Sequence, residues 1–328
     1  MKNTKNCRLG IMFRREHAPE ALPDFARRTE QAGFDELWVV EDCFYTSGIA
    51  AAATALACTQ KITVGLGIMP AVVRNPVFAA MEIATLCRMY PGRFLPGIGH
   101  GVTGWMRQIG ALPKSQLAAL EEVTLTTAKL LAGEEVTFHG QYLNLDQAKL
   151  VHPPRTVPPV SLGVIGPNSL HLSGRVAGGT ILSEYSNPAY VTWAKGQIQK
   201  GRLEGNRIGE HRLTVFAFAC AAETTAAARH KLRPMVAAAI ASGRIDPKLA
   251  PPGILPKAKE VRENGGQKAL EANMPDGWID QLTIAGTAKD WQLAIERLEK
   301  LGVHSVVLVP VPEAGLDEVE NFARNLLL

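Results

Sequence analysis

Apolar runs and helical patterns alternate along this chain in a regular order. Short apolar runs at residues 9–13, 36–40, the first half of 62–76, and 93–98 are each followed by helical spacing, at 19–33, 47–58, 76–89 and 115–132. Further apolar runs at 160–165, 179–182, 213–220 and 305–309 continue the rhythm, again with helical stretches between or after them. Strands that alternate with helices pair in parallel, because each crossover helix returns the chain to the same end of the sheet.

Eight strands and eight helices in this order predict an α/β fold of the TIM (β/α)8 barrel type, as one domain over residues 1–328. Two segments interrupt the pattern. Residues 134–145 alternate polar and apolar side chains around His139-Gly140, which predicts a β-hairpin insertion. Residues 242–277 include prolines at 251, 252 and 256 and a charged helix near 257–272, which predicts a helical insertion over one face of the barrel. The alternative is an open doubly wound sheet, which usually has fewer strands.

Composition narrows the functional classes. Hydrophobic residues make up 46% and charged residues 20% of the 328, enough for a large buried core. The net charge is only +4 and no basic stripe alternates with aromatic residues, which argues against a nucleic-acid partner. No apolar run reaches the ~18 residues of a membrane span, and the N-terminus has no secretory pattern. Five scattered cysteines without a CxxC pair indicate a reduced, cytoplasmic protein, and the dispersed histidines predict no metal site.

In a TIM barrel the site forms where the strands end at their carboxyl side. Glycines and a few polar residues gather at these positions in the sequence. They are Phe13, Arg14, Arg15 and Glu16, then Glu41, Asp42 and Cys43, then 67–74, 99–101, Ile165 and Gly166, and Ser183 and Glu184. A glycine-lined mouth with few titratable groups favours a redox cofactor over hydrolysis. Gly166 precedes a helix, and the free N–H groups at a helix N-terminus suit a phosphate.

Five segments together resemble the luciferase-like flavin and deazaflavin oxidoreductases, in particular the coenzyme F420-dependent branch related to methylenetetrahydromethanopterin reductase. They are AGFDELWVVED (32–42), ITVGLGIMPAVVRNP (62–76), PGRFLPGIGHG (91–101), GVIGPNSLHLSGRVAGGTIL (163–182) and IAGTAKDWQLAIERLEKLGVHSVVLVP (284–310). The resemblance implies a luciferase-like barrel, a homodimer, and coenzyme F420 as cofactor. FMN, which serves monooxygenases of the same superfamily, is the alternative cofactor.

The resemblance also implies which residues surround the cofactor. A non-proline cis peptide at Gly67–Ile68 would bulge against the deazaflavin ring. The other residues expected to contact the cofactor are Asp42, Cys43, Gly99, His100, Gly101, Val164, Ile165 and Gly166, the last three through backbone N–H groups to its phosphate. Phe13, Arg14, Glu16 and Trp105 are the expected substrate contacts.

The implied reaction is hydride transfer from C5 of F420H2 to a C=C or C=N bond of a small organic substrate. His100 and Glu184 are the expected proton donors. Cys43 and Val102 stand where the F420-dependent glucose-6-phosphate dehydrogenases carry a histidine and an acid, which argues against sugar oxidation. An FMN-dependent monooxygenase and a non-catalytic flavin-binding protein are the alternatives.

Overall fold

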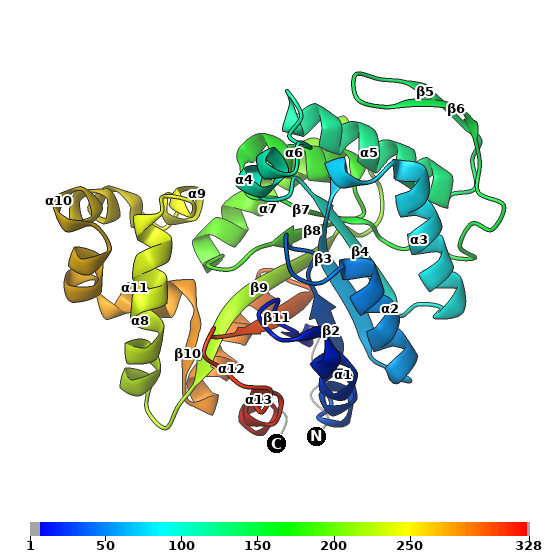
Figure 1. Cartoon of the computed structure of the whole chain (residues 1–328). Helices are drawn as coiled ribbons and strands as arrows, with labels where there is room; N and C mark the ends of the chain where they lie inside the picture. The colour runs from blue at the N-terminus through cyan, green and yellow to red at the C-terminus, as the bar shows by residue number, and fades with distance from the viewer. Residues whose placement is uncertain (1–6, 327–328) are drawn as a thin grey trace.

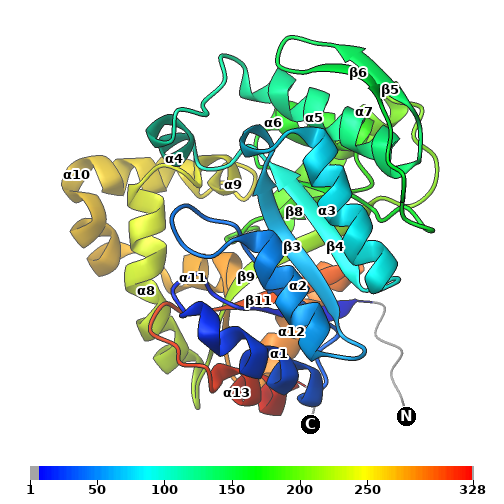
Figure 2. The same cartoon turned by 45° about the vertical axis from the view of Figure 1, so that its right-hand side comes forward.

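The computed structural model describes residues 7–326, and a closed parallel barrel forms its centre (Figure 1; Figure 2). The strands are β1 (Arg8–Met12), β2 (Glu36–Val39), β3 (Thr63–Pro70), β4 (Phe94–Gly99), β7 (Ser161–Gly163), β8 (Gly179–Leu182), β9 (Arg212–Ala221) and β11 (Ser305–Pro310). They pair in the order β9-β11-β1-β2-β3-β4-β7-β8, and β8 pairs back onto β9. This last pairing closes the sheet, so the predicted TIM barrel is confirmed and the open sheet was wrong. Residues 1–6, part of the N-terminus in which the sequence shows no secretory pattern, lie outside the described residues.

Helices surround the barrel in chain order (Figure 1). Those around the barrel are α1 (Leu22–Gln31), α2 (Gly48–Cys58), α3 (Pro76–Met89), α5 (Gln116–Leu131), α6 (Pro167–Val176), α7 (Pro188–Glu204), α8 (Thr225–Ala241), α12 (Ala288–Lys300) and α13 (Glu318–Leu326). Single 3-10 turns, η1 (Pro19–Ala21) and η2 (Ala71–Val73), precede α1 and α3. Proline is the first residue of α3, α6 and α7, where its missing N–H costs nothing. None of the described helices is long and apolar enough to cross a membrane.

The predicted hairpin is formed by β5 (Val136–His139) and β6 (Asn144–Ala148), which pair antiparallel. A single carboxylate on α5 holds its turn. Glu122 accepts hydrogen bonds from the backbone N–H groups of Gln141, Tyr142 and Leu143 at 2.8–3.1 Å. The hairpin therefore lies along α5, on the outside of the barrel (Figure 2).

A helical lobe stands beside the barrel and is larger than the predicted insertion (Figure 1). It contains α8, α9 (Asp246–Leu249), α10 (Leu255–Asn273) and α11 (Asp276–Leu282), with α10 kinked at Gly265 and Gly266. These helices share a buried apolar cluster of their own that includes Leu232, Leu270 and Ile279. Two short elements were not predicted, α4 (Thr103–Gln108) and β10 (Ile284–Gly286), the latter paired with the end of β9.

The amino end of the barrel is filled by a polar cluster and its middle by apolar side chains. Glu36, fully buried, accepts hydrogen bonds from Trp38 Nε1 at 2.8 Å and Ser305 Oγ at 2.7 Å, and it pairs with Arg212. Above them Met12, Ile181, Phe216, Val307 and Val309 pack together. Because these layers fill the amino end and the middle of the barrel, its open space lies at the carboxyl ends of the strands.

Candidate active site

Two adjoining cavities lie at the carboxyl ends of the strands. The inner cavity, about 400 Å³, is lined by the ends of β2, β3, β4 and β7 and by α4. The outer cavity, about 660 Å³, lies between the barrel mouth and the helical lobe. The residues that line both cavities are Met12, Val40, Asp42, Val102, Ile165, Ser183 and Glu184. A molecule in the inner cavity would thus contact whatever occupies the outer one.

The floor of the inner cavity is a bulge in β3. The Gly67–Ile68 peptide is cis, which confirms this prediction from the sequence, and the pairing of β3 with β4 shifts register between Leu66 and Met69. The Ile68 side chain fills the space that two glycines leave: a Cβ on Gly163 would lie 2.6 Å from Ile68 Cγ2, and one on Gly99 2.9 Å from Ile68 Cδ1. Gly99 does not line the cavity, contrary to expectation, because Ile68 covers it. A second cis peptide, Cys43–Phe44, was not predicted.

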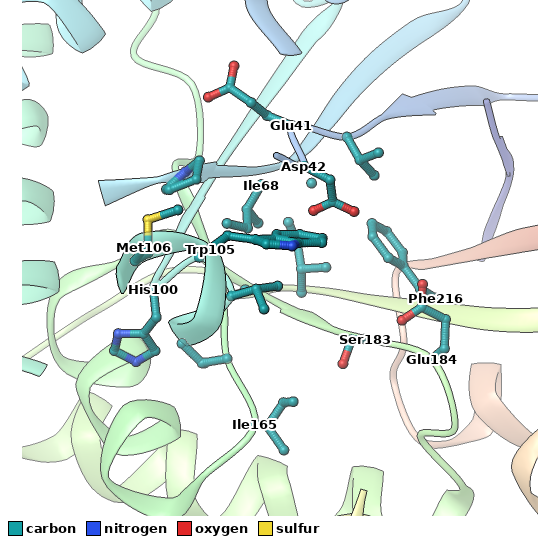
Figure 3. A pocket seen from close by; sticks show the side chains of 18 of the residues that line it. Glu41, Asp42, Ile68, His100, Trp105, Met106, Ile165, Ser183, Glu184 and Phe216 are labelled. Atoms are coloured by element: carbon teal, nitrogen blue, oxygen red, sulfur yellow. The ribbon is translucent and has the colours of Figure 1, made fainter. Parts of the chain in front are cut away.

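Arg15 ties together three elements at the rim. Its guanidinium donates to Asp42 Oδ2 at 2.7 Å and lies 5.2 Å from the ring centre of Tyr45 and 5.5 Å from that of Trp105. Trp105 comes from the unpredicted helix α4 and projects over the inner cavity (Figure 3). The sequence placed Arg15 in the rim cluster but gave it no role, since its partners lie far along the chain.

His100 lies at the end of the inner cavity nearest α6. Its Nε2 is 2.9 Å from Ser169 Oγ, in the first turn of α6, and its Nδ1 is buried. Burial lowers the pKa of this imidazole below its usual value and favours the neutral ring, against the smaller opposing effect of the Gln116 backbone. Gly166 lines the same end, and a Cβ added there would meet no atom within 4 Å. The predicted Val164, Ile165 and Gly101 also line the inner cavity, as does Cys43.

Ser183 and Glu184 lie across the cavity from His100 (Figure 3). Behind them is Lys248 of α9, only 1% exposed, which sequence reasoning missed. Its Nζ donates to Ser183 O at 2.9 Å, to Ser183 Oγ at 2.6 Å and to Glu184 O at 2.5 Å. Burial lowers the pKa of Lys248 to about 7, against the opposing effect of the nearby Glu184 carboxylate. No local pattern marks this lysine, because its partners are 64 and 65 residues away.

Three expected substrate contacts lie outside the inner cavity. Phe13 lines neither cavity, because side chains alternate along β1: Met12 faces the barrel mouth and Phe13 faces out, where it packs edge-on against Phe25. Arg14 and Glu16 line the outer cavity and pair at 2.9 Å. Arg14 is further fixed by a hydrogen bond of 2.6 Å to the Pro310 carbonyl.

The chain resembles characterised proteins over nearly its whole length. The model of the luciferase-like monooxygenase family matches residues 8–305. The 5,10-methylenetetrahydromethanopterin reductase of Methanolobus tindarius is 30% identical over 305 residues, 91% of this chain and 92% of that protein. An F420-dependent glucose-6-phosphate dehydrogenase of Nakamurella multipartita is 30% identical over 194 residues, 54% of this chain and 56% of that protein. The structure of the coenzyme F420 dependent tetrahydromethanopterin reductase from Methanopyrus kandleri covers 98% of both chains with a TM-score of 0.83 and 25% identity. The chain belongs to the luciferase-like monooxygenase family.

Proposed function

We propose that this protein is a coenzyme F420-dependent oxidoreductase that reduces a C=C or C=N bond of a small organic substrate. Relatives named as F420-dependent enzymes support the cofactor, and the reductase that matches 91% of the chain supports the direction. The observation that carries the proposal is the inner cavity, whose floor is the Ile68 bulge of β3 and which ends at the N-terminus of α6. Bound F420H2 would supply hydride from its C5 position.

The inner cavity suits a flat ring with an anionic tail. Gly166 leaves open space before α6, whose first N–H groups have no partner within the helix. Val164, Ile165 and Gly166 would hold the phosphate there, next to His100 and Ser169. Asp42, Cys43, Ile68 and Gly101 would surround the ring.

The outer cavity would take the substrate. Arg15 lines the outer cavity and lies 5.5 Å from the ring centre of Trp105, which lines the inner cavity, so the two side chains would cover the reacting atoms between the cavities. Arg14 and Glu16 would contact the more distant part of the substrate, and Glu184, between the two cavities, would lie beside its reacting bond.

Two alternatives are less well supported. An FMN-dependent monooxygenase and a non-catalytic binding protein share the fold, but the relatives that match most of the chain are reductases. Sugar-phosphate oxidation is also disfavoured. The glucose-6-phosphate dehydrogenase relative matches only 54% of the chain, and Cys43 and Val102 replace the histidine and acid expected of that chemistry.

We further propose a cytoplasmic homodimer. Every one of the five cysteines is a free thiol, as in a reducing compartment. An apolar face of α2 and α3 is exposed and would be covered by a second copy; Phe78 is 62% and Met89 62% exposed there.

The cofactor is tested by titrating the apoprotein with F420 and, separately, with FMN, followed by fluorescence and thermal shift. We expect micromolar or tighter binding of F420 and much weaker binding of FMN.

Gly166→Val should weaken F420 binding by tenfold or more, because the new side chain projects into the cavity. The melting temperature of the apoprotein should not change, since the Gly166 φ of −79° accepts any residue. Tight FMN binding without F420 binding would contradict the proposal.

A further inference from the structure

We propose that Ser183 and Lys248 deliver the proton in this reduction: the Ser183 hydroxyl protonates the substrate, and the Lys248 ammonium then reprotonates Ser183. The inference rests on the proposed reductase function. It replaces His100 and Glu184 as the direct donors, and it makes the helical lobe, through α9, part of the active site.

Lys248 is positioned to donate to the Ser183 hydroxyl. A lysine that is 1% exposed normally pairs with a carboxylate. Here the three donors of the ammonium are directed at two backbone carbonyls and one hydroxyl, all on Ser183 and Glu184. Because every donor is used, the orientation of Nζ toward Ser183 Oγ is fixed.

The Ser183 hydroxyl connects this buried cation to the cavity. Its oxygen accepts from Lys248 at 2.6 Å, so its own hydrogen is free to donate elsewhere. Ser183 lines both the inner and the outer cavity, where hydride donor and acceptor would meet. Figure 3 shows it between Ile165 and Glu184, beneath Trp105.

The turn after β8 is unusual and is held by the same lysine. Tyr185 has a φ of 65°, a left-handed conformation that aromatic residues rarely adopt. The bonds from Lys248 to the carbonyls of Ser183 and Glu184 directly precede it, and Asn187 Nδ2 donates back to the Lys248 carbonyl at 2.8 Å. Lys248 therefore also fixes where the Ser183 hydroxyl points.

The surroundings let the ammonium lose and regain a proton near neutral pH. Burial lowers the pKa of Lys248 to about 7. The Glu184 carboxylate favours the charged form, and the Tyr190 ring centre lies 5.8 Å from Nζ. Other charged groups around the outer cavity and on the lobe have partners of their own or are exposed. These are Arg14 paired with Glu16, Arg15 with Asp42, Asp246 with Arg262, and the exposed Arg244.

Hydride from the reduced deazaflavin, with its electron pair, adds to one atom of the C=C or C=N bond, so the substrate is reduced and the cofactor oxidised. The other atom takes a proton as the Ser183 O–H bond breaks and a new C–H or N–H bond forms. Lys248 Nζ–H gives its proton to Ser183 Oγ, and the neutral amine later recovers one from water in the outer cavity.

Titration of Lys248 tests the pair without any substrate. Lysine labelled with ¹³C at Cε gives one NMR signal per residue, and the signal lost in Lys248→Met identifies Lys248. We expect it to titrate between about pH 6 and 8 in the wild type and to shift its midpoint in Ser183→Ala. The proposal would be overturned if Lys248 stays charged above pH 9, or if its titration midpoint is the same in Ser183→Ala as in the wild type.

Steady-state kinetics distinguish proton delivery by Ser183 and Lys248 from a purely structural role of Lys248 in holding the turn after β8. Oxidation of F420H2 is followed with cyclohex-2-enone as a C=C probe and 2-methyl-1-pyrroline as a C=N probe. Ser183→Ala should lower kcat by about 10²-fold or more while KM and F420 affinity change little. Lys248→Arg keeps the donors but does not release a proton, so it should not restore the rate lost in Lys248→Met.

The matched control is Ser186→Ala, which removes a neighbouring hydroxyl that donates to the Ser183 carbonyl at 2.6 Å but lines neither cavity. Its kcat should equal that of the wild type. Full rescue by Lys248→Arg, with an unchanged pH profile, would show that Lys248 only braces the turn. A wild type that binds F420 but reduces neither probe would count against the reductase function, and the NMR titration would still decide the role of Lys248.

Discussion

Lys248 couples the stability of the fold to pH. Burial lowers its pKa to about 7 in the folded chain, whereas the unfolded chain keeps a pKa near 10.5. Between these values the unfolded state binds more protons, so the free energy of unfolding rises as pH increases from 7 toward 10.5. Relative to Lys248→Met, the wild type should gain roughly 2 kcal/mol between pH 7 and 9, measured by urea unfolding. Lys257→Met, which removes a surface lysine, is the control and should leave the slope unchanged. If the free energy of unfolding changes with pH in the same way for the wild type and Lys248→Met, the lowered pKa of Lys248 would be contradicted.

Glu36 supports the barrel from its amino end. It is fully buried and gathers Trp38, Ser305 and Arg212, which come from three different strands. Replacing Glu36 by Gln should cost about 3–5 kcal/mol in chemical unfolding, because the Arg212 cation is left without its counter-charge. The control Glu260→Gln alters an exposed pair with Lys257 and should change stability by less than about 1 kcal/mol. Equal effects of the two substitutions would argue against a structural role for the buried pair.

At the scale of elements, two glycines set the distance between α6 and α7. A Cβ on Gly201 would lie 1.9 Å from the His171 carbonyl oxygen, and one on Gly174 2.0 Å from that of Ile198. Backbone cannot move aside as a side chain can, so Gly201→Ala should destabilise the protein by at least about 3 kcal/mol. Gly196→Ala, on the same helix but facing open space, should instead stabilise it by about 0.5–1 kcal/mol. A neutral Gly201→Ala in thermal or urea unfolding would show that the helices can separate.

Elements with strong local signals could be predicted closely. Proline at the first position set the starts of α3 and α6, and the predicted end of α3 at residue 89 agrees with the structure. The barrel followed because its strands and helices alternate. α4 and β10 were missed because six and three residues are too few to show a period.

The candidate site could be predicted only where it depends on neighbours in sequence. Gly166 before α6 and the cis bond at Gly67–Ile68 sit in recognisable segments. The sequence predicted that Phe13 contacts the substrate, but its side chain points away from the barrel mouth and packs on Phe25. Successive side chains point to opposite faces of a strand, so an error of one residue at the end of β1 reverses the predicted direction. The roles of Arg15 and Lys248 could not be predicted, because their partners Asp42 and Ser183 are distant in sequence and come close only in the folded barrel.

For the whole molecule, the exposed face of α2 and α3 argues for a two-fold dimer. Phe78, Met81 and Met89 project from α3 and, with Ile49 and Ala53 of α2, line a shallow apolar groove of about 380 Å³. In an isologous contact the same face of each copy would meet, and this contact would remove from water an apolar surface that is costly to leave exposed. Light scattering after size exclusion should therefore give about twice the chain mass of 35.4 kDa.

The variant Phe78→Glu/Met81→Glu should be monomeric, because four carboxylates would face one another across the two-fold axis without partners. Its unfolding free energy, extrapolated to low protein concentration, should stay close to that of the wild type, since both side chains are already exposed in the single chain. Ile208→Glu changes an isolated side chain, 96% exposed and outside this groove, and should remain dimeric. A monomeric wild type, or a dimer that survives both glutamates, would place the contact on another face of the barrel.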